Sequence, residues 1–259
     1  MGQIKALRHN KDIKRLKTPI IKIKTLYRDF GAIFLEVKVL LFTVFCAVYV
    51  FVFLIGILFS NRFQIFMKRI LGPASSGYIF IFWVFFPILF SWLFNRAYWL
   101  LLPNLWGLIF IPIGLSITLS LVALEYYYRI VLMKNKALAM RINRVKFGWR
   151  EMPRMLFNQL YKVALPEECI LRGFLIVFLM DSLGLIATIF VSATLSGLCH
   201  LRSGWLNDWL RVFFTGTRGF VYALIFVLSR SVWVSIIVHV LSNMIAVPVV
   251  KSIASCIRN

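Results

Sequence analysis

The chain has 259 residues, of which 61% are hydrophobic, and its mean hydropathy is +0.86. Soluble domains are about 45–50% apolar, so this composition excludes an ordinary water-soluble domain and predicts an integral, multi-pass membrane protein. The net charge of +21 comes largely from two stretches outside the apolar runs, with ten Lys or Arg in residues 1–38 and eight in residues 125–154. This placement favours contact with membrane lipids over binding of nucleic acid, because basic loops lie against anionic headgroups.

The apolar runs predict an all-α fold, a polytopic membrane helix bundle with about seven to eight transmembrane helices. Residues 1–36 form a basic N-terminal tail with no recognisable cleavage site, so we expect the first span to be retained as an anchor. N-terminal transmembrane helices follow over residues 37–124, with one span near 37–60. Residues 78–124 are nearly continuous apolar sequence, long enough for two spans, and are interrupted at Asn95-Arg96.

The second half of the chain begins with a basic loop or surface helix at 125–156. A membrane core is predicted at 157–250, and a short C-terminal tail at 251–259. Within the core we expect a turn at Asp181-Ser182 and a break at Ser229-Arg230-Ser231 between the last two spans, 212–228 and 232–250.

The charge distribution conflicts with a simple count of spans. If the N-terminus is cytoplasmic, three spans before Glu125 place the basic segment outside, against the positive-inside tendency. Either one segment within 78–124 is re-entrant, or the chain has a further span.

Ionisable residues within the membrane core first occur in the sequence Glu167-Glu168-Cys169-Ile170-Leu171-Arg172. Such groups cost at least about 2.5–3.5 kcal/mol each at mid-bilayer, so they usually mark function. Glu168 and Arg172 are four residues apart and share one face of a helix, which predicts an ion pair. Glu167 then points elsewhere and is a candidate general base. The alternative is an interfacial ion pair that only ends a helix.

Three further polar residues follow in the same region: His200, which ends the apolar run 183–201, and His239 and Asn243 in the last run. His239 and Asn243 are four residues apart and therefore point the same way from one helix. Because Glu167 opens one span and His200 closes the next, the two lie at the same membrane face. The last span returns toward that face, so these residues are expected to converge on one shallow intramembrane pocket.

The chemistry of this set favours a metal-free hydrolase. Two His and one Glu could hold zinc, but neither an HExxH motif nor a Cys ligand set is present. A GxSxG elbow is also absent, which disfavours a serine nucleophile. In the favoured interpretation Glu167 deprotonates a water that His200 helps to hold. His239 and Asn243 then donate hydrogen bonds to the oxyanion.

Together these motifs resemble the CPBP family, which includes CAAX prenyl endopeptidases and Abi-type bacterial membrane proteins. The family pattern is EExxxR, then FxxxH, then HxxxN. Glu167, Glu168 and Arg172 match the first element and His239 and Asn243 match the third, while His200 matches the second with Ser196 in place of the expected Phe. The segments 219–222 and 231–233 also resemble the approach to the last family motif. The resemblance covers about residues 160–245.

The resemblance implies a glutamate-dependent intramembrane endopeptidase that cleaves a membrane-associated peptide or protein. It assigns water activation to Glu167 and His200, and the oxyanion hole to His239 and Asn243. We expect no cofactor, although a metal-dependent mechanism has also been proposed for such proteins and stays open. The expected location is the bacterial inner membrane.

Two other functions remain open at this stage. One is a non-catalytic membrane scaffold or regulator that binds a sensor or precursor protein, which the departure at Ser196 and the basic tail would suit. The other is a transporter that uses Glu167, Glu168 and Arg172 as a proton relay.

Overall fold

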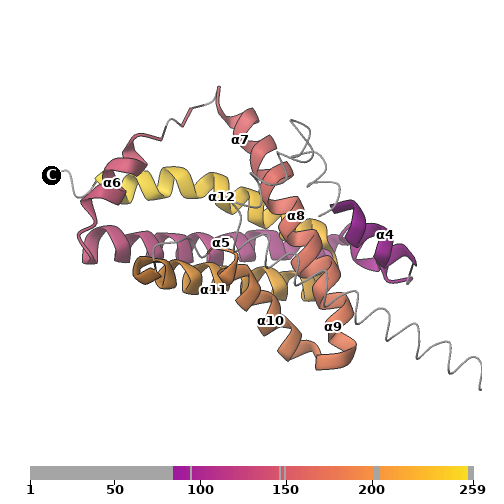
Figure 1. The fold of residues 1–259 in the computed structure, drawn as a ribbon. Helices are drawn as coiled ribbons and strands as arrows, with labels where there is room; N and C mark the ends of the chain where they lie inside the picture. The colour runs from indigo at the N-terminus through magenta and orange to yellow at the C-terminus, as the bar shows by residue number, and fades with distance from the viewer. Residues whose placement is uncertain (1–83, 94, 146, 149, 201–204, 256–259) are drawn as a thin grey trace, which may run out of the picture. The chain divides into compact units, whose positions relative to one another are not determined.

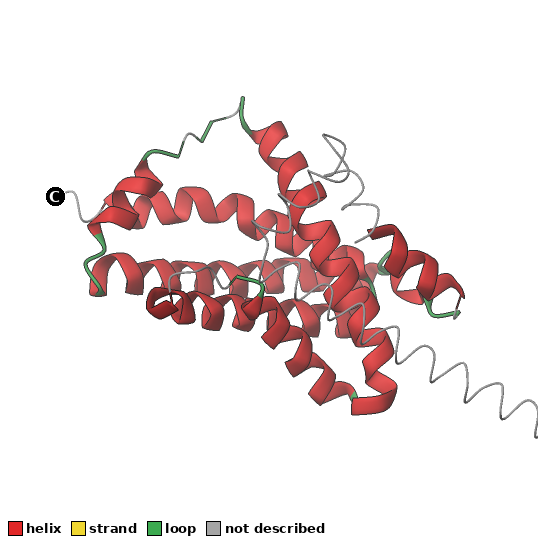
Figure 2. Ribbon diagram, viewed as in Figure 1, coloured by secondary structure: helices red, strands yellow, loops and turns green. Residues whose placement is uncertain are grey.

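The computed structural model describes residues 84–93, 95–145, 147–148, 150–200 and 205–255, all of which belong to one compact unit, Ile57–Asn259. Every regular element among these residues is helical (Figures 1 and 2). In chain order they are α4 (Phe86–Leu93), the 3₁₀ turn η3 (Ala97–Leu100), α5 (Leu105–Tyr127), the π turn η4 (Tyr128–Leu132), α6 (Lys136–Asn143), α7 (Met152–Gln159), the π turn η5 (Leu160–Ala164), α8 (Leu165–Glu168), the π turn η6 (Cys169–Phe174), α9 (Leu175–Leu183), α10 (Leu185–Leu198), α11 (Trp205–Ser229) and α12 (Val232–Ser255).

Three long apolar helices form the centre of this unit. The segments Leu105–Leu132, Trp209–Ser229 and Val232–Ser255 are long and apolar enough to cross a membrane, and α10 is a shorter apolar helix. Helices α5, α11 and α12 all contact one another, and α10 packs on α11. The predicted all-α membrane helix bundle is confirmed. The predicted span near 37–60 lies outside the described residues, so the count of seven to eight spans stays a prediction.

Local chemistry explains where the central helices begin and break. The Asn104 side chain accepts a hydrogen bond from the Gly107 amide at 2.8 Å, which caps the start of α5. Asn95 and Arg230 have positive φ angles of 56° and 54°, at the two breaks predicted around Asn95-Arg96 and Ser229-Arg230-Ser231. Both predicted breaks are therefore present.

Some predicted boundaries differ from those observed. The turn expected at Asp181-Ser182 lies at Gly184, where φ is +76°, a conformation that glycine adopts without steric cost. Helix α5 continues to Tyr127, so Glu125 lies in a helix and is only 2% exposed, although the predicted basic loop or surface helix begins at that residue. Helix α11 begins at Trp205, seven residues before the predicted span. Helices extend past the apolar runs because backbone hydrogen bonding does not require apolar side chains.

The segment that carries the paired glutamates is helical without interruption from Met152 to Leu183. Two π turns, η5 and η6, flank the single α-helical turn of α8. Pro166 lies in that turn and has no N–H to donate to the preceding turn, which disfavours regular α-helical bonding. Such π turns change which way the following side chains face and occur frequently at functional sites.

Small residues allow α10 and α11 to approach closely. A Cβ atom on Gly197 would lie 2.6 Å from the Val212 carbonyl oxygen, and one on Gly216 would lie 3.3 Å from the Ala193 carbonyl oxygen. Small residues at helix contacts are the usual means of close packing in membranes. The contact brings the end of α10, which leads to His200, against the middle of α11.

Candidate active site

The two glutamates of α8 have different surroundings. The Glu168 side chain is completely buried, whereas that of Glu167 is 25% exposed. Consecutive residues of a helix point in different directions, so one carboxylate faces the protein interior and the other faces a cavity. The general-base role of Glu167 stays a prediction.

Glu168 is held by two cationic or ionisable partners. Its Oε2 atom lies 3.3 Å from Nε of Arg172, which is also fully buried, and this is the predicted i, i+4 ion pair. Its Oε1 atom lies 2.8 Å from Nδ1 of His239, across 71 positions of sequence. A buried carboxylate is tolerated when it is paired and hydrogen-bonded. The arrangement ties α8 to α12.

Arg172 also links its ion pair with Glu168 to α10 and α11. One terminal nitrogen donates to the Ser196 hydroxyl at 3.0 Å and to the Gly219 carbonyl oxygen at 2.9 Å. A Cβ atom on Gly219 would lie only 2.5 Å from Cβ of Ser196, so the two helices touch at this point. The serine that departs from the family pattern is thus an acceptor for Arg172, and its Cβ leaves no space for a side chain at position 219.

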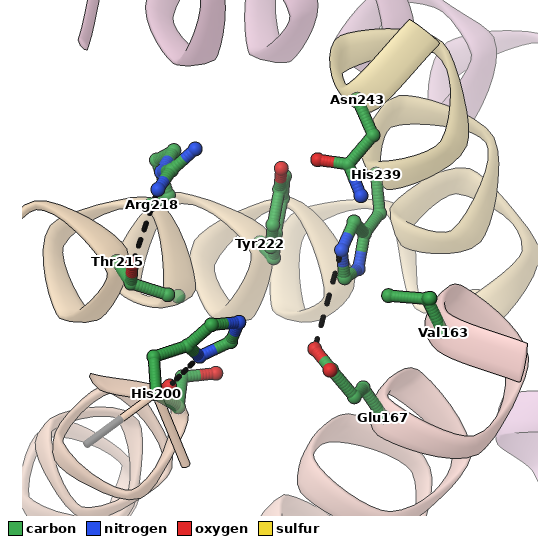
Figure 3. A pocket seen from close by; sticks show the side chains of 10 residues that line it. Val163, Glu167, His200, Thr215, Arg218, Tyr222, His239 and Asn243 are labelled. Carbon is green, nitrogen blue, oxygen red and sulfur yellow. Dashed lines mark hydrogen bonds and ion pairs between the residues drawn. The ribbon is translucent and has the colours of Figure 1, made fainter. Parts of the chain in front are cut away.

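His239 is oriented from two sides. Its ring stacks on the Tyr222 ring with centroids 4.8 Å apart and an interplanar angle of 17°. Because Glu168 is paired with Arg172 as a carboxylate, the Nδ1–H group of His239 is the donor to it. The other nitrogen, Nε2, lies 4.0 Å from Oε2 of Glu167 (Figure 3). Nε2 is therefore the nitrogen presented to a reacting group.

His200 and Asn243 also have fixed orientations. Nδ1 of His200 donates to the Ser196 carbonyl oxygen at 3.0 Å, because a carbonyl oxygen can only accept. The Asn243 amide nitrogen donates to the Gln159 side-chain oxygen at 3.0 Å. A primary amide has two N–H groups, so one remains for a ligand.

A small cavity joins these side chains. It has a volume of about 60 Å³, enough for a few water molecules. Figure 3 shows Glu167, His200 and His239 pointing toward one another across this space. The lining residues come from η5, α8, α10 and the turn after it, α11 and α12, and they are Val163, Glu167, Ser196, His200, Thr215, Arg218, Gly219, Tyr222, His239 and Asn243.

Four of the six predicted site residues, Glu167, His200, His239 and Asn243, line this cavity together. Glu168 and Arg172 do not line it and instead lie behind His239. Within the described part of the chain, no three His, Cys, Asp or Glu side chains are grouped so that they could hold a metal ion.

Neither Arg218 nor Glu125 was predicted as a site residue, although both are ionisable residues in long apolar helices. Arg218 lies within the run 212–228 that was predicted as a span, and this was the signal that could have identified it. Glu125 was assigned to a basic loop or surface helix, so its burial was not expected.

The model of the family described as type II CAAX prenyl endopeptidase Rce1-like matches residues 149–245. This match confirms, over residues 149–245, the family resemblance that the motifs predicted. The match contains all six predicted site residues and begins before α7. Together with the long apolar helices, it identifies the chain as an integral membrane protein. No curated protein and no solved structure matches the chain.

Proposed function

We propose that the chain is a glutamate-dependent intramembrane endopeptidase that hydrolyses a peptide bond of a membrane-associated peptide or protein. The observation that carries the proposal is that Glu167, His200, His239 and Asn243, from three separate segments, line one cavity of about 60 Å³. A general base, a water-holding group and two hydrogen-bond donors are the parts that metal-free peptide hydrolysis needs. The match to a CAAX prenyl endopeptidase family supports the same reaction class.

In the proposed mechanism, Glu167 takes a proton from a water that His200 holds. Nδ1–H of His200 is used by the Ser196 carbonyl, so Nε2 of the neutral ring accepts a hydrogen bond from that water. The resulting hydroxide attacks the peptide carbonyl carbon, and a tetrahedral oxyanion forms. When this intermediate collapses the C–N bond breaks, and Glu167 returns its proton to the leaving amine.

His239 and Asn243 stabilise the oxyanion. Nδ1–H of His239 is already used by Glu168, so donation to the oxyanion requires a second proton on Nε2. Asn243 contributes the amide proton that Gln159 leaves free. Such preorganised donors are worth about 10²–10³-fold in rate each.

The test uses purified chain in lipid nanodiscs and a library of farnesylated peptides ending in Cys, two aliphatic residues and a variable residue. Cleavage is followed by mass spectrometry. Glu167→Gln is expected to lower the rate by about 100-fold or more, the contribution of a positioned general base. Glu151→Gln is the matched control, because Glu151 is exposed and is not among the cavity residues.

Equal cleavage by wild type and Glu167→Gln would refute the catalytic role of Glu167. Absence of cleavage by the folded wild-type chain, with a cellular phenotype unchanged by Glu167→Gln and His239→Gln, would favour the scaffold function.

A further inference from the structure

Four basic side chains surround α6 and take no part in the proposed hydrolysis. Lys134, Lys136, Arg141 and Arg144 are all exposed and together form the α6 basic surface. None of them lines the cavity, and none forms an ion pair with another described residue. Residues 126–150 contain no Asp or Glu, so the adjoining sequence supplies no carboxylate to balance these charges.

The apolar side of α6 faces the helix bundle. Ala139 is 5% exposed and forms a buried cluster with Ile130 of η4 and Ala254 of α12. Leu138 and Ile142 pack against that cluster from the same helix. Figure 1 shows α6 beside the end of α12. Because these positions face inward, the basic side chains of α6 are left on the outer side of the bundle.

Two aromatic residues of α5 indicate where α6 lies relative to the bilayer. Trp106 and Tyr127, near the two ends of α5, are 76% and 48% exposed. They are 21 positions apart, which at 1.5 Å per residue is roughly 32 Å and matches a hydrocarbon core about 30 Å thick. Exposed Trp and Tyr are typical of the two membrane–water interfaces. Helix α6 follows Tyr127 after one π turn and packs on the end of α12, so it lies at the level of the lipid headgroups.

Exposed apolar side chains lie among the basic ones. Leu132, Met133 and Met140 are each more than half exposed. A surface that faces only water or nucleic acid gains nothing from such side chains. An interfacial helix buries them at the acyl boundary, while Lys and Arg stay at the headgroups. The mixture therefore favours a lipid partner.

The opposite end of the central helices carries less free charge. Arg96 is paired there with Asp181. Arg230, at the start of α12, is exposed, and the neighbouring Ser231 hydroxyl donates to the Leu101 carbonyl oxygen at 2.8 Å. Among the described residues, an anionic lipid surface therefore attracts the α6 end more strongly than the other end.

We propose that the α6 basic surface binds anionic phospholipid headgroups, with α6 lying in the membrane interface. A lipid phosphate accepts paired hydrogen bonds from a guanidinium group and a charge-assisted bond from an ammonium group. Each Lys or Arg near an anionic membrane surface adds about fivefold in affinity. The inference does not depend on the proposed function, because none of the four side chains lines the cavity.

The experiment measures lipid binding to the full chain, purified in detergent, by native mass spectrometry. The protein is titrated with phosphatidylglycerol, which is anionic, and with phosphatidylcholine of the same acyl chains, which has no net charge. We expect the wild-type chain to bind phosphatidylglycerol about tenfold or more tightly than phosphatidylcholine.

Arg141→Gln should weaken phosphatidylglycerol binding about fivefold and leave phosphatidylcholine binding unchanged. Arg230→Gln is the matched control, because it removes the same charge from an exposed arginine at the other end of the helices. It should stay within about twofold of wild type, since that end lies several Debye lengths away. Lys136→Gln/Arg141→Gln/Arg144→Gln should bind the two lipids with similar affinity. Arg141→Lys keeps the charge and should keep the preference.

Equal affinity of the wild-type chain for the two lipids would overturn the inference. An unchanged preference in the triple variant, or the same loss in Arg230→Gln as in Arg141→Gln, would overturn it as well. A short RNA oligonucleotide that binds the wild-type chain more tightly than phosphatidylglycerol would assign the surface to nucleic acid instead. If the triple variant does not fold, Arg141→Gln decides. Peptide cleavage is measured separately, so failure of this inference leaves the proposed function intact.

Discussion

Replacing Arg172 by Met tests the buried ion pair behind the cavity. The substitution leaves Oε2 of Glu168 without its partner at 3.3 Å, and it removes the donor to the Ser196 hydroxyl and the Gly219 carbonyl oxygen. Removing one partner of a fully buried pair costs about 3–5 kcal/mol, because the other charge stays buried and uncompensated. We expect a loss of this size in the free energy of unfolding, measured by reversible unfolding in mixed micelles.

A second variant separates the charge from the packing of the side chain. In Glu168→Gln/Arg172→Met the buried charge is gone, so the double variant should recover about half or more of the lost stability. Arg154→Met makes the same substitution at an exposed position of α7 and should change stability by less than about 0.5 kcal/mol. A double variant as unstable as Arg172→Met alone, or an Arg172→Met variant as stable as wild type, would refute the reasoning.

Three further predictions concern the contacts around this pair. Gly219→Ala should cost about 1–3 kcal/mol, because its Cβ would lie 2.5 Å from Cβ of Ser196, and Ser196→Gly should relieve most of that cost in an unfolding assay. Ser196→Phe, which restores the family residue, should also destabilise the chain by about 1–3 kcal/mol and lower peptidase activity, because the ring would displace Arg172; an active, stable variant would contradict this. Tyr222→Leu should lower kcat about tenfold through loss of the ring stacked on His239, whereas Tyr222→Phe keeps that ring and should stay within about threefold of wild type. Equal kcat values for the two Tyr222 variants would exclude a role for stacking.

The sequence predicted which residues meet, but not how they are connected. Glu167, His200, His239 and Asn243 were identified because polar residues are costly in apolar helices, and helix direction predicted a common face. The contact between Glu168 and His239 could not be predicted, since it joins positions 71 apart and depends on the rotation of α8 between two π turns. The domain boundaries proposed from composition stay predictions.

The role of Ser196 shows most clearly what the sequence alone lacks. As a departure from a family motif it indicated a change in the pocket wall. In the structure its hydroxyl accepts from Arg172, and its Cβ fills the space that Gly219 leaves open. A serine and a glycine 23 positions apart compensate each other, and such a pair is recognised only when α10 and α11 are seen in contact.

Arg218 was missed for a related reason. Its charge within the run 212–228 was visible in the sequence. Its ion pair with buried Glu125 was not, because Glu125 lies 93 positions away and outside the family match. The N-terminal half of the chain therefore contributes to the surroundings of the cavity. Motif comparison within residues 149–245 alone does not include that contribution.

The central claim is that Glu167 makes this chain a peptidase in the membrane. The most direct test is a quantitative comparison of peptide termini in membranes from cells that carry wild type, Glu167→Gln or Glu151→Gln at equal abundance. At least one precursor should stay uncleaved in Glu167→Gln cells, while Glu151→Gln cells should match wild type. Identical peptide termini in all three membranes would contradict it.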